Sequence, residues 1–522
     1  MTSKINDELA DSSSLPKPQP LKHSSSQREL ELERIELNAY ITNSDENIDI
    51  NSLRGRRTSI ITRANIGDTV EDTISLSSQV TDYDEGIEYP DGGTRAWVVL
   101  FGAFLGFIAD FGLINSIGAI QAYISVHQLA GVSSATTAWI FSLFLGCSYC
   151  AGIVSGILFD ETGVKIPFIL GTILMVGGLF ITANAESIGT FIVGFGIICG
   201  FGCALCMNPL MGVVSHWFKK KRAMAMGLAT LGGSVGGIIF PLMLNSLYSR
   251  VGFVWAIRIL AFTCLIILIL SFLMIKERLS ANILRENTDI EENEKNSFKI
   301  FQKLIQFLQN FVKYSKEAVV FKYLLEPKFL FCTLAASLGE ISLICSMTYF
   351  ASYAIFIGQS ENTAFLLLTV INALGLVGRY TTGVLADKYG VFNVMIVMIF
   401  GVFVSNIVIW LGVCSTTKSS GALYAYSVIF GFFSSAVLSL TPACCGAISP
   451  TKDFGKRYAT MYFVGGISFV IGLAIAGVIL SANTLKSYNN FIIYCAGLSI
   501  SGDICWIISR WFIVGARINV KV

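Results

Sequence analysis

The sequence predicts an all-α membrane protein whose twelve membrane-spanning helices form two pseudo-symmetric bundles of six. Three observations lead to this fold class. Only 14% of the 522 residues are charged and 53% are hydrophobic, whereas about a quarter of the residues in an average soluble protein are charged. Apolar runs of roughly 20 residues, the length that crosses a bilayer, follow one another from Trp97 onward. A short motif recurs at the same place in each set of six runs.

Residues 1–90 differ in composition from the rest of the chain. They contain 9 Lys and Arg against 17 Asp and Glu and no apolar run, so they cannot bury enough apolar surface to offset the entropy lost on ordering. We expect a disordered cytosolic tail. No cleaved signal peptide is expected, because the first apolar run begins so late. The stretch RGRRTS at residues 54–59 suggests that a kinase acts on this tail.

The apolar runs are too long and too continuous for barrel strands of about ten alternating residues, so they are expected to be helices. Their expected bounds are 96–121, 136–159, 166–184, 189–213, 223–247, 255–275, 329–353, 363–385, 392–414, 421–445, 457–481 and 488–513.

These runs divide the chain into an N-terminal bundle at residues 91–275, a linker at 276–328, and a C-terminal bundle with a short tail at 329–522. Lys and Arg gather in alternate connections, which places both termini and the linker in the cytosol. Residues 299–314 place their apolar side chains on one helical face. This pattern favours a helix at the membrane interface, with a buried helical hairpin as the alternative.

A repeated motif relates the two bundles. GILFDETG begins at Gly156 and follows the second run, and GVLADKYG begins at Gly383 and follows the eighth. The two first glycines, and the aspartates Asp160 and Asp387, are each 227 residues apart (383 less 156, and 387 less 160). Internal duplication is typical of transporters in which two bundles rock around a shared site.

The G-x-x-x-D-x-x-G pattern and the arrangement of six plus six helices resemble the major facilitator superfamily over roughly residues 90–515. PDGGTRAWVVLFGAF from Pro90 and WFKKKRAMAMGLATLGGSVGG from Trp217 look like stretches of its monocarboxylate-transporter-like proteins. FGKRYATMYF from Phe454 and GFVWAIR from Gly252 are similar to the fungal riboflavin transporters of that family. The resemblance implies the major facilitator fold and alternating-access transport of a small organic solute, such as riboflavin or a related planar or anionic compound.

Two positions depart from the proton-coupled animal members of that family. Those members are expected to have a Lys in helix one and an Asp one turn before the Arg of helix eight. This sequence has Asn115 and Gly375 at these places and keeps Arg379. A proton-coupled monocarboxylate carrier is therefore the less favoured alternative. A nutrient sensor that has the same fold, and signals through its tail without transport, is a third possibility.

The resemblance also implies that helix two meets helix eleven and that helix eight meets helix five. Asp160 and Asp387 would then lie at helix N-termini of the opposite half, where a carboxylate contributes about 0.3 to 2 kcal/mol. Such contacts would form a breakable cytosolic gate; a tight turn that needs Asp and Gly for backbone geometry is the alternative. The candidate gate residues are Gly156, Asp160, Gly163, Lys165, Lys221, Arg222, Gly383, Asp387, Gly390, Lys456 and Arg457.

Ionisable residues inside the apolar runs are candidates for the substrate site, because each costs about 2.5 to 3.5 kcal/mol to insert. Arg379 presents a fork of donors for substrate oxygen atoms, unless it extends toward the cytosol as a structural residue. Glu340 has either a transport or proton role or a static bond between helices. Asp110 is a candidate counter-charge for Arg379. Asn115, Asn208, Asn372 and Thr441 add polar groups at cavity depth, and Tyr349 and Tyr353 are candidates to stack on a planar ring.

Other patterns exclude competing classes of protein. A net charge of +2 provides no basic surface for nucleic acid. Cys199, Cys203 and Cys206 share a helical face without a charged neighbour, which is more typical of packing than of a metal site. GGSVGG at residues 232–237 lacks the ending of a phosphate-binding loop and indicates close helix approach. With no catalytic set in view, we expect a monomeric, cofactor-free carrier that is not an enzyme, in the plasma membrane rather than the vacuolar membrane.

Overall fold

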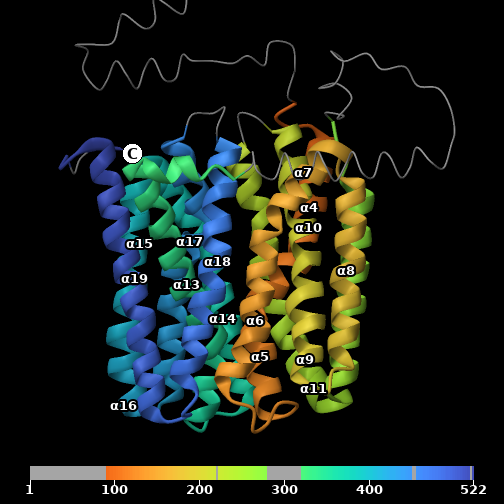
Figure 1. Ribbon diagram of the computed structural model, residues 1–522, viewed down its shortest axis with the longest axis vertical. Coiled ribbons are helices and arrows are strands. Elements are labelled where there is room, and N and C mark those ends of the chain that lie inside the picture. Colours follow the sequence, from red (N-terminus) through yellow and green to blue (C-terminus); the bar gives the residue numbers. More distant parts are fainter. Residues whose placement is uncertain (1–89, 219–221, 279–318, 450–453, 518–519, 522) are drawn as a thin grey trace, which may run out of the picture. The chain divides into compact units, whose positions relative to one another are not determined.

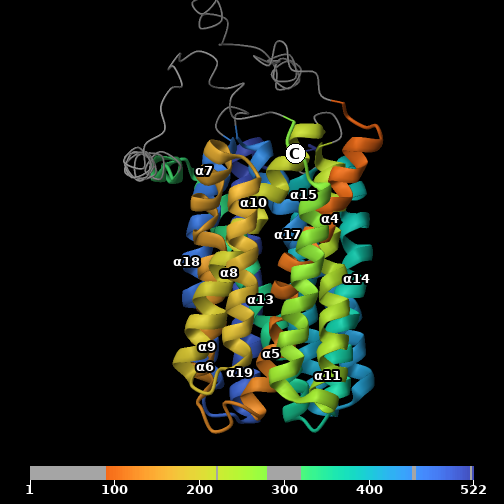
Figure 2. The ribbon, with the colours of Figure 1, turned by 90° about the vertical axis from the view of Figure 1, so that its right-hand side faces the viewer.

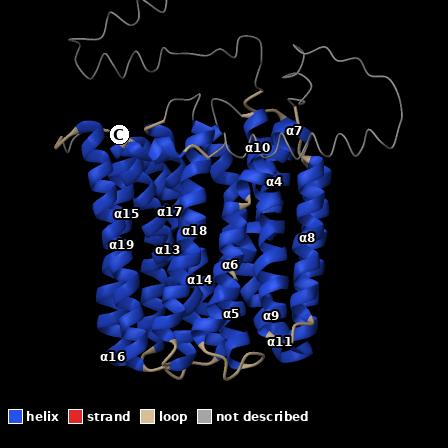
Figure 3. Cartoon of the chain, in the orientation of Figure 1, coloured by secondary structure: helices blue, strands red, loops and turns tan. Residues whose placement is uncertain are grey.

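The structure, a computed structural model of the whole chain, describes residues 90–218, 222–278, 319–449, 454–517 and 520–521. These residues belong to one compact unit, Glu88–Val522. Helices and connecting loops make up all of the described chain, without a strand (Figure 3). The expected tail, its RGRRTS stretch and the expected interfacial helix at residues 299–314 lie outside the described residues.

The first half of the chain supplies six crossings. They are α4 (Thr94–Asn115) with α5 (Ile117–Val126), α6 (Ser134–Cys150) with α7 (Gly152–Thr162), α8 (Lys165–Ala183), then α9 (Ile188–Phe191) with the π-helical η1 (Ile192–Cys199) and α10 (Gly200–Trp217), and finally the two arms of α11 (Arg222–Met274). Gly252 separates these two arms, because its φ of 74° and ψ of 175° take the chain out of helical conformation.

The second half repeats this plan. A short 3₁₀ turn, η2 (Phe321–Leu325), precedes its six crossings. These are α13 (Pro327–Phe356), α14 (Glu361–Tyr389), α15 (Val391–Val404) with η3 (Ser405–Cys414) and α16 (Ser415–Thr417), α17 (Ser420–Ala447), α18 (Phe454–Leu480) and α19 (Leu485–Val514).

Among the described residues, eleven helical segments are long and apolar enough to cross a membrane. One of them, Met224–Met274, contains the break at Gly252, so the chain makes twelve crossings. This confirms the predicted fold class. In Figure 1 the end of the bundle that holds α7 and the C-terminus is at the top, and the end that holds α5 and α16 is at the bottom. We call these the upper and lower ends.

Glycines bring helix backbones into direct contact within the first half. A Cβ placed on Gly236 of α11 would lie 2.3 Å from the carbonyl oxygen of Ile108 and 2.6 Å from the Cα of Gly112, both on α4. At Gly232 a Cβ would lie 2.2 Å from the carbonyl oxygen of Phe104. The GGSVGG stretch therefore allows close helix approach, as its small residues predict.

Two helix pairs form most of the contact between the halves. α6 packs against α18, and the first arm of α11 packs against α14 (Figures 1 and 2). A Cβ on Gly477 of α18 would lie 2.4 Å from that of Ala138, and one on Gly146 of α6 would lie 2.3 Å from the Val470 side chain. At the lower part of the interface, Gly118 of α5 lies against the Met347 carbonyl of α13.

We predict that Gly236→Ala lowers the free energy of unfolding by about 1 to 3 kcal/mol, because the added methyl group overlaps backbone atoms of α4 that cannot rotate away. Thermal unfolding of the detergent-purified chain measures this change. Gly227→Ala on the same helix is the matched control, because a Cβ there has no atom within 4 Å. Equal stability of the two variants would contradict the proposed packing.

Candidate substrate cavity and gates

A partly enclosed cavity lies between the two halves. Its walls come from α4, α5 and α6 of the first half and from α13 and α17 of the second, around a cavity of about 20 Å³. This volume holds about one water molecule, so the cavity must widen before it can take a larger solute. Most of the wall is apolar, and Asn115, Tyr149 and Thr348 are its polar members. The remaining lining residues are Ile114, Ile117, Gly118, Leu343, Ile344, Met347 and Leu438. An apolar pocket with a few polar groups is the usual form of a small-molecule site.

Asn115 and Asn372 both donate to the glycine-rich stretch of α11. The Asn115 Nδ2 atom donates to the Gly233 carbonyl at 3.0 Å, within the first half. The Asn372 Nδ2 atom donates across the interface to the Gly237 carbonyl at 3.1 Å, and to the Leu368 carbonyl at 3.0 Å. Of the predicted cavity residues, Asn115 alone is part of the cavity wall.

Arg379 also bridges the halves. Its Nη1 atom donates to the Thr230 carbonyl of α11 at 2.9 Å, and its Nε atom is buried without a hydrogen-bond partner in the described chain. The side chain therefore points toward the other half and not along its own helix. The Nε donor is therefore available to a group from outside the described chain.

Asp110 lies elsewhere. The side chain is fully buried, with the Cys203 thiol of α10 beside it and no other hydrogen-bond partner for its carboxylate oxygens among the described residues. Gly106, one helical turn earlier, packs on Leu210 of α10. Asp110 thus faces the interior of the first half, and the structure does not bring it to Arg379.

Glu340 is buried in the second half and bonds to a neighbouring helix. The Tyr462 hydroxyl of α18 donates to the Glu340 Oε1 atom at 3.2 Å. Thr441 of α17 lies beside the same carboxylate and donates its own hydroxyl hydrogen to the Val437 carbonyl. The sequence allows two roles for Glu340, in transport or in a hydrogen bond between helices. In this conformation Glu340 makes the hydrogen bond between helices.

The remaining predicted cavity residues are away from the cavity. Asn208 donates to the Gly152 carbonyl and so joins α10 to α7 inside the first half. Tyr349 packs edge-on against Phe491 at 5.4 Å between ring centroids. Tyr353 packs against Trp410 at 5.6 Å, and both hydroxyls are buried without a partner in the described chain. This pair belongs to the aromatic core of the second half.

Sequence reasoning missed two tyrosines that face each other across the interface. Tyr149 of α6 and Tyr462 of α18 have ring centroids 5.5 Å apart and planes within 7°. The sequence carried a signal for one of them, because Phe454, Tyr458 and Tyr462 recur every four residues and so share one helical face. Nothing in the pattern around Tyr149 indicated that it would reach the cavity.

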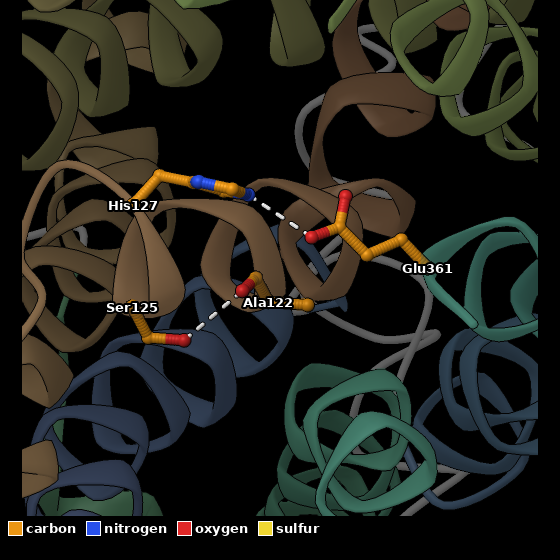
Figure 4. Close-up of polar contacts among 4 residues, drawn as sticks. All are labelled: Ala122, Ser125, His127 and Glu361. Carbon is orange, nitrogen blue, oxygen red and sulfur yellow. Dashed lines mark hydrogen bonds and ion pairs between the residues drawn. The ribbon is translucent and has the colours of Figure 1, made fainter. Parts of the chain in front are cut away.

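Polar contacts close the lower end. The His127 Nε2 and Glu361 Oε1 atoms are 3.0 Å apart and join the end of α5 to the start of α14. Figure 4 shows these side chains pointing toward each other, with the Ser125 hydroxyl turned to the Ala122 carbonyl. Deeper in the interface, the Ser352 hydroxyl donates to the Gln121 Oε1 atom at 2.7 Å.

The predicted gate lies at the upper end. Gly163 and Gly390 end α7 and α14 with φ of 76° and 94°, so these two positions need glycine for backbone geometry. Asp387 is exposed, and its carbonyl accepts a hydrogen bond from Lys521. Lys165 and Lys456 are exposed. There is space around the two motif glycines: a Cβ on Gly383 would meet no atom within 4 Å, and a Cβ on Gly156 would touch Asn208 at 3.8 Å.

Arg457 has a partner in its own half. Its Nη2 atom lies 2.5 Å from the Glu326 Oε1 atom, and its guanidinium lies 4.6 Å from the centre of the Tyr323 ring. The side chains of Asp160, Lys221 and Arg222 are outside the described part of the structure. The contact between Asp160 and the start of α18 therefore stays a prediction.

Residues 99–417 match the sequence pattern of the Major Facilitator Superfamily. The chain belongs to this superfamily. It is 41% identical over 449 residues to the riboflavin transporter MCH5 of Saccharomyces cerevisiae, covering 84% of this chain and 83% of that relative. It is 30% identical to the MFS transporter asaE of Aspergillus flavus, covering 83% and 90% of the two chains. It is also 31% identical to a fujikurins efflux protein of Gibberella fujikuroi, covering 78% and 81%.

A solved structure has the same fold. The bacterial homologue of the human lysosomal transporter Spinster, in an inward-facing and unoccupied conformation, has a TM-score of 0.56 and 15% identity, covering 81% of this chain and 98% of that one. The protein is therefore a multi-pass membrane transporter of the major facilitator superfamily with a small-molecule substrate.

We predict that Glu326→Gln lowers the free energy of unfolding by about 1 to 2 kcal/mol. The Arg457 side chain is only 5% exposed and would lose its charged partner, while the 39% exposure of Glu326 limits the loss. Denaturation of the purified chain in detergent measures the effect, with Lys322→Gln on the exposed face of η2 as the control. An unchanged midpoint for Glu326→Gln would show that this pair adds no stability.

Proposed function

We propose that the protein carries riboflavin, or a related planar compound, across the plasma membrane by alternating access. The observation that carries this proposal is a cavity whose wall is built from both halves of the duplicated chain. A site shared between two bundles can be exposed first to one side of the membrane and then to the other, as the bundles tilt. The 41% identity to a riboflavin transporter supports the substrate class.

Contacts between the halves support a conformation that is closed at the lower end. Gln121 with Ser352 and His127 with Glu361 join the halves at the lower end. The charge bias of the connections places the upper end, the tail and the linker in the cytosol. On this assignment the conformation described here is closed toward the outside of the cell.

Alternating access requires the two bundles to tilt, and the hydrogen bonds between them are weak enough to break. Arg379 and Asn372 each cross the interface to a backbone carbonyl of α11. Hydrogen bonds between membrane helices contribute about 0.6 kcal/mol on average, so a bound substrate that offers its own acceptors can replace them. Arg379 is the residue we assign to substrate oxygen atoms, because its buried Nε atom has no hydrogen-bond partner in the described chain.

The remaining parts of the proposal concern partners. We infer a monomer that transports without catalysing a reaction, binds no nucleic acid, and is regulated by a kinase that acts on its cytosolic tail.

Proton-coupled monocarboxylate transport is the rival to riboflavin transport. Efflux of a fungal metabolite is a second candidate, favoured by the 31% identity to the fujikurins efflux protein.

Uptake of labelled riboflavin tests the proposal. We expect the full chain to restore uptake in cells that lack their own flavin carriers, and Arg379→Ala to reduce the initial rate at least tenfold at equal surface expression. Arg258→Ala is the control, because that arginine lies at the lower end of α11 and bonds to Asn184 within the first half. No riboflavin movement in either direction would contradict the substrate assignment. Uptake of monocarboxylates driven by a pH gradient would favour the rival.

The proposed cytosolic gate gives a separate prediction. We expect Asp160→Asn to reduce transport several-fold while the protein still reaches the membrane, because the amide lacks the charge that favours a helix N-terminus. Initial uptake rates and surface labelling measure the two effects. Unchanged transport by Asp160→Asn would leave Asp160 with a role in the turn alone.

A further inference from the structure

A row of aromatic side chains runs along α18 toward the cavity. Phe454, at the upper end of the helix, is followed one turn later by Tyr458 and one further turn later by Tyr462. Their ring centroids are 5.6 Å and 4.7 Å apart in succession. The row ends at the Tyr149 ring of α6, which lies in the cavity wall. A row of aromatic rings therefore extends from the upper end to the cavity.

The last two rings of this row belong to different halves of the transporter. Tyr149 and Tyr462 are stacked with an interplanar angle of 7° and centroids 5.5 Å apart. Glycine sets their spacing, because a Cβ on Gly466 of α18 would lie 2.6 Å from the Cys150 sulfur and 3.3 Å from the Tyr149 Cβ. Phe469 supports the Tyr149 ring from the edge at 4.9 Å. Any tilt of one half relative to the other changes the gap between the stacked faces.

Charged groups lie close to this stack. The Tyr462 hydroxyl donates to Glu340, and Tyr149 interacts electrostatically with Glu340, Asp110 and Arg379. Of these, Glu340 is the one joined to the stack by a hydrogen bond. Glu340 is an acceptor for a ring N–H, and Arg379 is a donor to ring carbonyl oxygens. The edge of a flat heterocycle that alternates carbonyl, N–H and carbonyl groups offers the matching set.

We propose that Tyr149 and Tyr462 form an aromatic clamp that takes a planar heterocyclic ring between them, with the imide edge of the ring directed to Glu340 and Arg379. The inference rests on the proposed function for its substrate class and assigns the residues that recognise the ring. A ring about 3.5 Å thick enters when the halves separate at this level. It replaces the contact between the tyrosines with two contacts of its own. Binding also releases Glu340 from Tyr462, so the carboxylate becomes free to accept the ring N–H.

Riboflavin itself reports on the clamp, because a tyrosine stacked on an oxidised flavin quenches its fluorescence by electron transfer and a phenylalanine does not. The probe is riboflavin titrated into the full chain in lipid nanodiscs, with binding measured in parallel by equilibrium dialysis. For the wild-type protein we expect bound riboflavin to be strongly quenched. The double variant Tyr149→Phe, Tyr462→Phe should bind riboflavin no more than about twofold more weakly, because stacking on both faces is retained. The emission of bound flavin should rise, because neither face of the ring then meets a tyrosine.

Removing the ring face has a different effect. We expect Tyr149→Leu to weaken riboflavin binding roughly two- to twelvefold, the range that corresponds to one lost aromatic contact. Tyr488→Phe is the matched control, because that tyrosine packs against Tyr353 and Phe356 inside the second half, away from the cavity wall. Its affinity and quenching should equal those of the wild-type protein. If Tyr149→Leu fails to fold, the emission of the Tyr149→Phe, Tyr462→Phe double variant still decides the question.

The Glu340 contact has its own readout. Riboflavin methylated at the imide nitrogen lacks the N–H, and we expect it to bind the wild-type protein several-fold more weakly than riboflavin does. Tyr462→Phe keeps the ring face and removes the hydroxyl that competes for Glu340, so riboflavin should bind it at least as tightly as the wild-type protein. If Tyr462 only stabilised the bundle, Tyr462→Phe would lose a stabilising hydrogen bond and would bind riboflavin more weakly than the wild-type protein.

These measurements distinguish a failure of the aromatic clamp from a failure of the riboflavin assignment. If riboflavin binds the wild-type protein and Tyr149→Leu binds it with equal affinity and equal quenching, the clamp is overturned and the transport proposal stands. If a folded wild-type protein binds no riboflavin, both the clamp and the riboflavin assignment are overturned. Equal affinities for riboflavin and its methylated form would remove Glu340 from the site.

Discussion

The structure depends on direct contact between helix backbones at glycine. In a membrane the surrounding lipid is as apolar as the helices, so helices associate through close packing and hydrogen bonds. Gly232 and Gly236 seat α11 against α4, and Gly146, Gly466 and Gly477 seat α6 against α18. The first contact lies within the N-terminal half. The second, together with the packing of α11 against α14, joins the two halves around the cavity.

The polar groups in this interface are few and weakly bound, and this suits a protein that must move. Arg379 and Asn372 donate to backbone carbonyls of the opposite half and not to carboxylates. A buried ion pair would resist separation, because each charge would be left in a low-dielectric interior. By contrast, Arg457 and Glu326 form their ion pair within one half, where the pair can stay intact while the halves rock.

Helix number and duplication were predictable from the sequence, whereas the directions of several side chains were not. Tyr349 and Tyr353 lie one turn apart in an apolar helix, as residues that line a cavity would, yet both belong to the aromatic core. Apolar residues occur on all faces of α13 and its Ser and Thr residues are scattered among them, so periodicity does not reveal which face meets the other half. For the same reason Asp110 could not be assigned to the interior of its own bundle.

What the sequence determined by itself was the crossing of the membrane. Lipid offers no hydrogen-bond partners, so apolar runs of this length must close their backbone bonds as helices, and the 227-residue spacing of the repeated motif relates the halves. Tertiary structure alone decided which residues meet across the interface. Tyr149 and Tyr462 are 313 positions apart in the chain, and their stacking depends on the packing of α6 against α18, which no local pattern encodes.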